Sequence, residues 1–199
     1  EKAGLPVLGF LPPVPEAEIP DRHLGLVTAD ELSDLREKID RLADAAEEGI
    51  DLHALCALAQ TAKPLTDTHM PLARATDFSV RIAVAKDRAF CFYYEDNLDI
   101  LRKLGAEIQY FSPIHDRNLP VETCAVYLGG GYPELHAKAL SENISMRNAI
   151  RQAVAEEMPC IAECGGYLYL KDSIADPDGV EWPMAGVLPG GSRDTGKLG

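Results

Sequence analysis

From residue 81 onward, short apolar runs alternate with amphipathic stretches, and this alternation limits the possible fold more than any other feature. We expect strands at four apolar runs: residues 81–85, 106–111, 125–128 and 158–162. Helical patterns lie between them at 97–104, closed by Gly105, and at 141–157. Strands separated by helices predict an α/β fold, in which a doubly wound parallel sheet is covered by helices on both faces.

The N-terminal part of the chain is dominated by one amphipathic helical pattern. Apolar residues recur in alternating steps of three and four between Leu32 and Ala46. Thr28 and Glu31 match a capping box at the start of this helix, and Gly49 supplies the left-handed residue that commonly ends one. The sequence therefore predicts a helix that begins near Thr28 and ends at Gly49.

Two smaller elements accompany this helix. A short apolar strand followed by a proline-rich loop is expected at residues 5–16, and a short helix at 51–60. One strand and two helices are too few to enclose a core, so we interpret residues 1–60 as the end of a domain. Residues 61–79 lack periodicity and are interpreted as a linker to a second domain at 80–199.

The composition is that of a globular protein and excludes several functions. Of the 199 residues, 46% are hydrophobic, but no apolar run approaches the roughly 20 residues of a membrane-spanning helix. The chain has 19 basic and 32 acidic residues, and the resulting net charge of −13 repels nucleic-acid phosphates and anionic membranes. We therefore expect no nucleic-acid partner and no membrane partner.

The cysteine pattern indicates a reducing compartment. The number of cysteines is odd and their spacing is scattered, as expected for free thiols in the cytoplasm: Cys56, Cys91, Cys124, Cys160 and Cys164. There is no C-x-x-C pair, and we expect no metal site in this chain. The first residues lack both an initiating Met and a signal pattern, so we interpret them as the edge of a longer protein.

One cysteine lies between an apolar strand and a helix-like run. Cys164 has Ala162 and Gly166 two positions to either side, which leaves room for a sharp turn. This is the pattern of a nucleophile elbow, with Cys in place of Ser and Ala in place of the first Gly. Such a turn exposes the sulfur, the following helix start favours the thiolate, and the Gly165 N–H is free to stabilise an oxyanion. The alternative is a buried structural thiol.

Three consecutive glycines, residues 129–131, follow the third expected strand. They could form a phosphate cradle, but neither G-x-G-x-x-G nor G-K-[ST] is present. They could form a tight turn without a ligand. Taken with the elbow, the favoured interpretation is the second half of an oxyanion hole that faces Cys164 from the neighbouring strand.

Together these motifs closely resemble the cobyrinic acid a,c-diamide synthase family, which comprises glutamine-dependent corrinoid amidases. The resemblance rests on an ordered set: residues 92–98 (FYYEDNL), 105–107 (GAE), 111–113 (FSP), 129–134 (GGGYPE) and 162–167 (AECGGY). Upstream, residues 8–12 (LGFLP) and 19–26 (IPDRHLGL) look like the end of that family's ATP-binding synthetase domain, which itself resembles dethiobiotin synthetase.

The resemblance implies a two-domain organisation. Residues 1–60 would be the C-terminal part of the ATP-dependent synthetase domain, of P-loop α/β fold. Residues 80–199 would be the N-terminal part of a flavodoxin-like class I glutamine amidotransferase domain, incomplete at its C-terminus. The implied enzyme is a carbon–nitrogen ligase: MgATP activates the a- and c-acetate carboxylates of cobyrinic acid in cobalamin biosynthesis, and L-glutamine supplies the ammonia. Hydrogenobyrinic acid and nickel-sirohydrochlorin are alternative tetrapyrrole substrates.

The resemblance also assigns roles to individual residues. Cys164 matches the nucleophile that attacks the glutamine carboxamide. Gly130, Gly131 and Gly165 lie where the oxyanion-binding backbone is expected. Glu163 belongs to the motif without an assignable role. Three further residues match a family signature and are interpreted as packing or as substrate contacts: Tyr93, Tyr94 and Asn97.

Several parts of the implied machinery fall outside this sequence. The catalytic His and carboxylate are expected after residue 199, because no His follows Cys164. His136, near the glycines, is interpreted as a helix surface residue. The ATP and Mg²⁺ ligands are expected before residue 1, so we expect the fragment alone to be inactive. A homodimer is an open possibility.

Two functions of other classes remain open. One is a cysteine hydrolase or oxidative-stress protein of flavodoxin-like fold, although such proteins usually carry His directly after the Cys, where this chain has Gly165. The other is a non-catalytic binding module, in which Cys164 would have the reactivity of an ordinary thiol.

Overall fold

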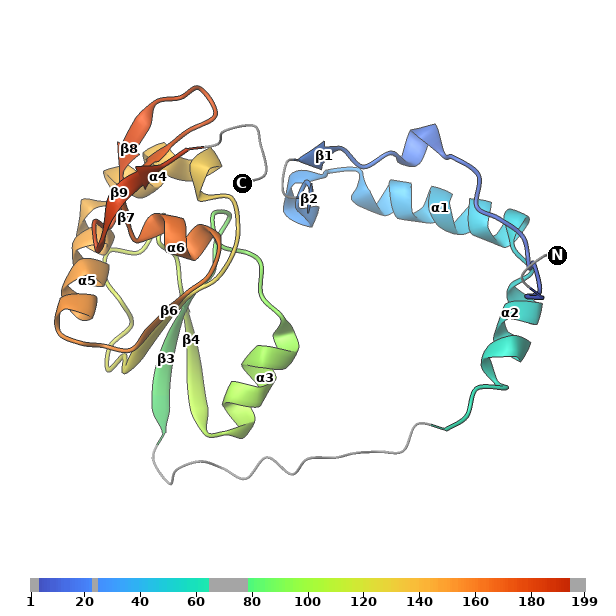
Figure 1. Ribbon diagram of the computed structural model, residues 1–199, viewed down its shortest axis with the longest axis horizontal. Helices are drawn as coiled ribbons and strands as arrows, with labels where there is room; N and C mark the ends of the chain where they lie inside the picture. Colours follow the sequence, from blue (N-terminus) through green and yellow to red (C-terminus); the bar gives the residue numbers. More distant parts are fainter. Residues whose placement is uncertain (1–3, 23–24, 65–78, 194–199) are drawn as a thin grey trace. The chain divides into compact units, whose positions relative to one another are not determined.

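The computed structural model describes residues 4–22, 25–64 and 79–193, and the chain forms two compact units (Figure 1). The first unit is Glu1–Thr68 and the second is His69–Gly199. In the described residues, no helix is both long enough and apolar enough to cross a membrane.

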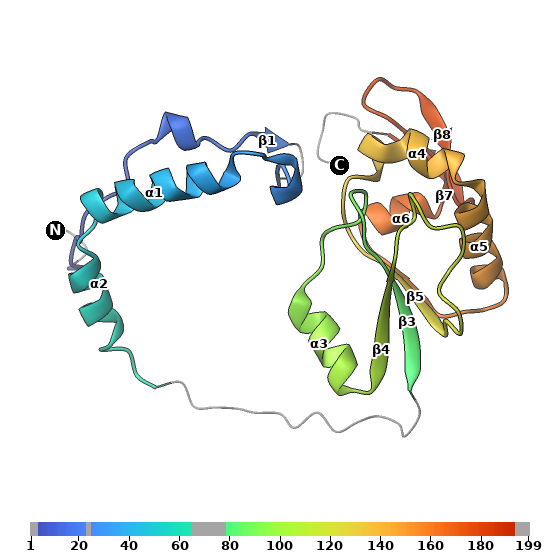
Figure 2. The ribbon, with the colours of Figure 1, turned by 180° about the vertical axis from the view of Figure 1, so that it is seen from behind.

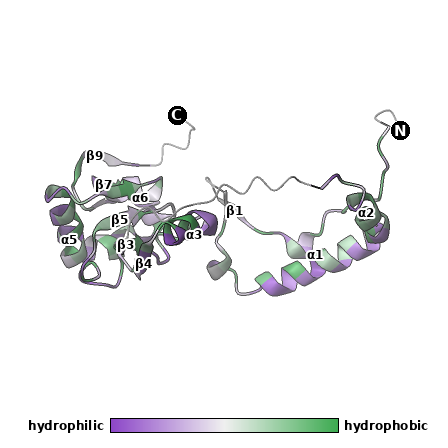
Figure 3. Cartoon of the chain, turned by 90° about the horizontal axis from the view of Figure 1, so that it is seen from below, coloured by the Kyte–Doolittle hydropathy of each residue, from purple (hydrophilic) through white to green (hydrophobic). Residues whose placement is uncertain are grey.

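The first unit consists of short elements around one long helix. Its elements are η1 (Pro15–Ala17), β1 (Asp21–Arg22), β2 (Gly25–Leu26), η2 (Ala29–Glu31), α1 (Leu35–Gly49) and α2 (Leu52–Ala59). Hydrophobic and hydrophilic residues alternate along α1 (Figure 3), but neither α1 nor α2 buries a single side chain. Within the described part of this unit, the helices therefore have no core of their own to cover.

The expected capping box is present but caps a different element. The Thr28 N–H donates to the Glu31 carboxylate at 3.0 Å, and this pair encloses the 3₁₀ turn η2. Leu32 then adopts an extended conformation, and α1 begins only at Leu35. The prediction that the long helix begins near Thr28 is therefore wrong, because local capping chemistry completes a separate turn first.

Gly49 ends α1, as expected, but not through a left-handed conformation. Its φ is not positive, and a Cβ at this position would lie 2.5 Å from the carbonyl oxygen of Phe10. Glycine is needed here because the N-terminal segment crosses the helix end closely. The short strand expected at the start of residues 5–16 is wrong: before η1, this segment forms an isolated bridge between Gly9 and Ile50.

The second unit contains the expected parallel sheet. Its strands are β3 (Val80–Ala85), β4 (Ala106–Phe111), β5 (Ala125–Leu128) and β6 (Cys160–Ala162), all parallel, in the order β4-β3-β5-β6. The chain moves from β3 outward to β4 and then crosses back to β5 on the other side of β3. This is the flavodoxin-like doubly wound order, which confirms the predicted fold class.

Helices cover both faces of this sheet (Figures 1 and 2). On one face lies α3 (Glu95–Lys103), whose Leu98 packs with Val84 and Tyr127. The other face carries α4 (Ala137–Glu142), α5 (Ile144–Ala155) and α6 (Gly165–Tyr169). Ala83 and Ala85 face this second, larger core, so consecutive residues of β3 serve opposite faces.

The single helix predicted at 141–157 is two helices. Asn143 separates α4 from α5, and its side chain accepts a hydrogen bond from the Met146 N–H at 3.3 Å as the N-cap of α5. Its amide group also donates to the carbonyl oxygens of Pro113 (2.8 Å) and Asp116 (2.7 Å). The break thus follows from contacts with a distant loop, which the helical periodicity does not reveal.

A second, smaller sheet follows α6 and was not predicted from the sequence. It consists of β7 (Lys171–Ala175), β8 (Glu181–Pro183) and β9 (Leu188–Ser192), in the order β8-β7-β9. Residues between its strands join the larger core, where Met184 and Ala185 are buried. Arg151 of α5 donates to the Ala185 carbonyl oxygen at 2.6 Å, so this sheet is fastened to the helical layer.

Candidate active site

Three segments meet at the carboxyl ends of β3, β5 and β6. We call them the aromatic strap (residues 91–94), the glycine loop (residues 129–131) and the elbow (residues 163–166). In open α/β sheets, ligands bind at this edge, at the point where the strand order reverses, which here lies between β3 and β5. A pocket of about 440 Å³ lies there, lined by Cys91, Phe92, Tyr93, Tyr94, Gly130, Glu163 and Cys164.

Cys164 occupies the turn between β6 and α6 in a strained conformation. Its φ of 47° and ψ of −113° lie outside the regions that L residues favour, at a cost of about 1–3 kcal/mol. The turn is held from both sides: the Glu163 N–H donates to the Leu128 carbonyl oxygen at 2.9 Å, and the Leu168 N–H donates to the Cys164 carbonyl oxygen at 3.1 Å. The side chain of Cys164 is exposed at the pocket. This is the geometry of a nucleophile elbow.

Gly166 allows the elbow to lie directly against the neighbouring strand. A Cβ at Gly166 would lie 2.1 Å from the carbonyl oxygen of Leu128, the last residue of β5. The Gly166 N–H donates to the carbonyl oxygens of Gly129 (2.9 Å) and Glu163 (2.8 Å). The small residue two positions after Cys164 is therefore required by this close approach.

The glycine loop lies beside the elbow, as expected from the neighbouring strands. A Cβ at Gly130 would lie 3.6 Å from the Cβ of Cys164. A Cβ at Gly165 would lie 2.9 Å from the carbonyl oxygen of Gly131 and 3.2 Å from its nitrogen. The structure therefore brings together all four residues that the sequence predicts for the nucleophile and the oxyanion hole.

The orientation of two peptide groups decides which N–H of the glycine loop faces the elbow. The Gly129 carbonyl oxygen accepts a hydrogen bond from the Gly166 N–H, so the Gly130 N–H of this trans peptide points away from the elbow. The Gly130 carbonyl oxygen accepts two hydrogen bonds from N–H groups of the aromatic strap, at 3.1 and 3.0 Å. The Gly131 N–H therefore points away from the strap, and its nitrogen lies near the elbow, 3.2 Å from where a Cβ of Gly165 would be.

Tyr93 connects the strap to the glycine loop. Its hydroxyl donates to the carbonyl oxygen of Ala85, at the end of β3, and accepts the Gly129 N–H at 2.8 Å. Its ring occupies the space beside Gly129, where a Cβ would lie 2.5 Å from two ring atoms. Burial raises the pKa of Tyr93 above its ordinary value of 10, so the hydroxyl stays protonated and remains a donor at neutral pH. Tyr93 thus holds the start of the glycine loop.

Glu163 places a carboxylate at the pocket. Its Oε2 accepts a hydrogen bond from the Tyr127 hydroxyl at 3.2 Å, and the Tyr127 ring packs edge-on against Tyr93 at 5.3 Å between centroids. Burial first, and then the charge of Glu163, raise the pKa of Tyr127, so this hydroxyl also stays protonated.

The remaining sequence candidates divide into two groups. Tyr94 lines the pocket and is 78% exposed, whereas Asn97 lies in the first turn of α3 and does not line it. His136 ends the turn η3 (Pro133–His136), and no histidine in the described residues lines the pocket. Sequence reasoning missed Cys91 as a lining residue. Its position directly before the 92–98 motif, after the first strand of the sheet, is the signal that could have indicated it.

Comparison with known proteins identifies a family for the second unit, which contains the pocket. The model of the CobB/CobQ-like glutamine amidotransferase domain matches residues 81–197. That range contains the aromatic strap, the glycine loop and the elbow.

Curated relatives match almost the whole chain. A cobyrinate a,c-diamide synthase of Dehalococcoides mccartyi (strain CBDB1) is 44% identical over 191 residues, covering 94% of this chain and 41% of the relative. One of Listeria monocytogenes (serotype 4b, strain F2365) is 43% identical over 195 residues, covering 98% of this chain and 42% of the relative. A hydrogenobyrinate a,c-diamide synthase of Pseudomonas aeruginosa is 46% identical over 195 residues, covering 96% and 42%.

This chain thus spans about two fifths of the length of the relatives it matches. The family model alone covers more than half of the chain. With this match and with an elbow cysteine beside a glycine loop, the chain belongs to the family of CobB/CobQ-like glutamine amidotransferase domains.

Proposed function

We propose that this chain contains the end of one domain and the beginning of the next in a glutamine-dependent amidase. The amidase would convert the a- and c-acetate carboxylates of a corrinoid acid into amides. Residues 80–199 would be the first part of the domain that releases ammonia from glutamine. The observation that carries this proposal is the exposed, strained Cys164 beside the inward-facing Gly131 N–H. Backbone strain of this kind is typical of catalytic sites, and a module that only binds a ligand does not require a strained cysteine.

The proposed reaction begins at the sulfur of Cys164. The thiolate attacks the carboxamide carbon of glutamine, and the carbonyl oxygen becomes an oxyanion. The N–H groups of Gly131 and Gly165 are the proposed donors, since Gly165 carries the first N–H of α6, which has no partner within the helix. Collapse of this intermediate releases ammonia and leaves a glutamyl thioester, which water then hydrolyses to glutamate.

The base that accepts the thiol proton would come from outside this chain. No His follows Cys164 in the sequence, and none lines the pocket in the described residues. ATP and Mg²⁺ would likewise be held outside the chain: the sequence has no P-loop motif, and the described residues hold no His, Cys, Asp and Glu group able to bind a metal ion.

Residues 1–60 would be the end of the synthetase domain that activates the carboxylates. This assignment is supported by the apolar side chains that the described part of the first unit leaves exposed: Leu5, Val7, Phe10, Leu11, Ile39, Leu52, Leu55 and Leu58. Among the residues of the first unit whose burial the structure describes, one, Ala17, is buried. We propose that the remainder of the synthetase domain covers these side chains.

The proposed tetrapyrrole substrate is cobyrinic acid or hydrogenobyrinic acid, with nickel-sirohydrochlorin as the remaining alternative. Relatives named for each acid match at similar identity, 44% and 46%. Amidation of both acids should therefore be measured in parallel.

The test compares wild type with Cys164→Ser in the full-length protein. We expect the variant to lose glutamine hydrolysis by about a thousandfold or more, because a serine hydroxyl is a far weaker nucleophile without a matched base. Amidation with free ammonia, ATP and the corrinoid acid should persist. The matched control is Cys124→Ser, at an exposed cysteine outside the pocket, which should keep glutamine hydrolysis. If Cys164→Ser retains glutamine-dependent activity, the proposal is wrong.

A further inference from the structure

Glu163 is the one charged side chain among the residues that line the pocket. The others are two cysteines, a glycine and three aromatic residues. In the described part of the chain, Glu163 makes no ion pair, and it is exposed at the pocket. An exposed carboxylate among aromatic side chains can pair with a cationic group of a ligand.

The carboxylate is held in place rather than free to turn. The Glu163 backbone N–H is bonded to Leu128, and its Oε2 accepts the Tyr127 hydroxyl. Tyr127 is itself packed against Tyr93. One carboxylate oxygen is thereby used to orient the group, and the second is available to a ligand.

The placement of this carboxylate on the residue next to the nucleophile suits an α-amino acid amide. Glu163 and Cys164 are adjacent, with Cα atoms about 3.8 Å apart, and both line the same pocket. In glutamine, four bonds separate the amide carbon from the α-nitrogen, a reach of about 5 Å when extended. A substrate with its amide carbon at the sulfur can therefore place its α-ammonium at Glu163.

We propose that Glu163 binds the α-ammonium group of the amide donor and so selects a free α-amino acid amide over uncharged analogues. The aromatic side chains of the strap support the same charge, because ring faces attract cations. This inference rests on the proposed function and adds to it the residue that recognises glutamine.

The experiment separates this role from a merely structural one. Glu163→Gln keeps an oxygen that can accept the Tyr127 hydroxyl but removes the negative charge. In the full-length protein, we expect the KM for glutamine to rise about 10- to 100-fold, the loss of one charge-assisted contact, with kcat changed much less. Glutaramic acid, which is glutamine without its α-amino group, should be hydrolysed by wild type and variant with equal kcat/KM.

The matched control is Glu181→Gln, an exposed carboxylate on β8, which should leave both substrates unaffected. Equal losses on glutamine and glutaramic acid in Glu163→Gln would show a structural role and overturn the inference. If the variant does not fold, wild type can still refute the proposal: equal kcat/KM values for glutamine and glutaramic acid overturn the inference. Absence of glutamine hydrolysis in wild type would instead overturn the proposed function.

Discussion

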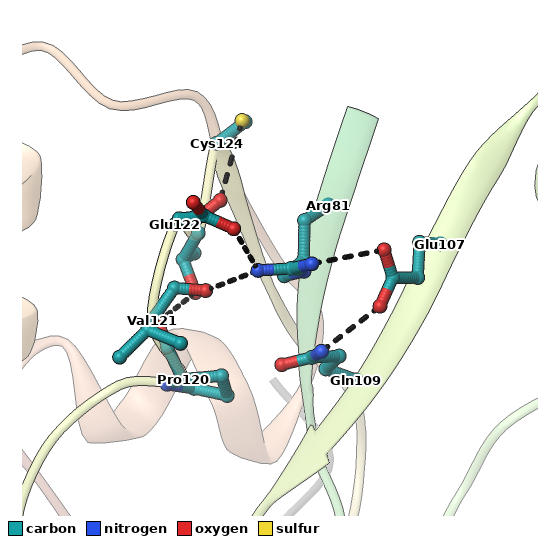
Figure 4. Close-up of polar contacts among 8 residues, drawn as sticks. Arg81, Glu107, Gln109, Pro120, Val121, Glu122 and Cys124 are labelled. Carbon is teal, nitrogen blue, oxygen red and sulfur yellow. Dashed lines mark hydrogen bonds and ion pairs between the residues drawn. The ribbon is translucent and has the colours of Figure 1, made fainter. Parts of the chain in front are cut away.

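The two ends of the parallel strands are held together by different means. We call the end at the pocket the carboxyl edge and the other end the amino edge. At the carboxyl edge, contacts between β5 and the elbow are made by backbone groups and glycines, with Gly166 pressed against Leu128. At the amino edge, a charged side chain joins three segments: Arg81 of β3 bonds to Glu107 of β4 (3.1 Å) and to Glu122 (2.7 Å), which precedes β5 (Figure 4). It also donates to the carbonyl oxygen of Val121 at 2.8 Å.

This difference reflects what each edge has to do. Ion pairs at the pocket would occupy the donors and the carboxylate that a substrate needs, so close backbone packing is a better way to hold that edge. Exposed ion pairs at the amino edge interfere with nothing, but water and salt weaken them. We therefore expect substitutions at the carboxyl edge to affect activity strongly, and substitutions at the amino edge to affect stability weakly.

The largest effect is expected for Gly166→Ala. The added methyl group would lie 2.1 Å from the Leu128 carbonyl oxygen, so the elbow must move away from β5. We expect the free energy of unfolding to fall by about 3 kcal/mol and glutamine hydrolysis to be lost, as measured by chemical denaturation and by ammonia release. Gly179→Ala, in an open turn with φ of 80°, is the control and should cost only about 1 kcal/mol. Similar losses in the two variants would contradict this account of the elbow.

An intermediate effect is expected for Tyr93→Phe. This change leaves the Gly129 N–H and the Ala85 carbonyl oxygen without their hydroxyl partner, so the glycine loop loses its anchor. We expect a loss of about 1–3 kcal/mol in unfolding free energy and a fall of about tenfold in kcat for glutamine, with KM nearly unchanged.

The control for this variant is Tyr110→Phe on β4, whose hydroxyl accepts a bond from Arg102 at 3.1 Å outside the pocket. It should leave kcat unchanged. A normal kcat in Tyr93→Phe would show that the loop is oriented without the hydroxyl and would leave Tyr93 with a packing role only.

The smallest effect is expected for Arg81→Met at the amino edge. Hydrogen bonding from Arg81 is the main cause that lowers the pKa of Glu107 below its ordinary value of 4.5. A lowered pKa in the folded state stabilises the protein above pH 4.5, and this contribution disappears as the pH falls through the lowered value. The variant should therefore have a slightly lower Tm than wild type at pH 7, and the difference should vanish in acid.

Thermal unfolding from pH 7 to pH 3, at low and high salt, measures this contribution. Arg117→Met, an exposed arginine outside the cluster, is the control. Glutamine hydrolysis at 25 °C should be unchanged in Arg81→Met. A Tm difference that persists below the lowered pKa of Glu107 would mean that the packing of the arginine side chain or its bond to the Val121 carbonyl oxygen, and not the pair with Glu107, holds this edge.

The candidate site was only partly predictable from the sequence. The position of Cys164 at a strand-to-helix turn follows from an apolar run that meets small residues. The neighbouring glycines follow from their place after another strand. Which glycine N–H faces the elbow does not follow, because it depends on hydrogen bonds that the carbonyl oxygens of Gly129 and Gly130 accept from other segments. Neither the Tyr93 anchor nor the Tyr127–Glu163 contact could be inferred from spacing.

The sequence by itself determined the parallel sheet and the place of the nucleophile, because both depend on local patterns: apolar periodicity and small residues around a turn. Only the tertiary structure decided where α1 begins, why Gly49 is glycine and why the chain breaks at Asn143. Only the tertiary structure also directed one glycine N–H, and not its neighbour, to the elbow. The physical reason is the same in each case: these features arise from contacts between segments far apart in the chain, which no local propensity encodes.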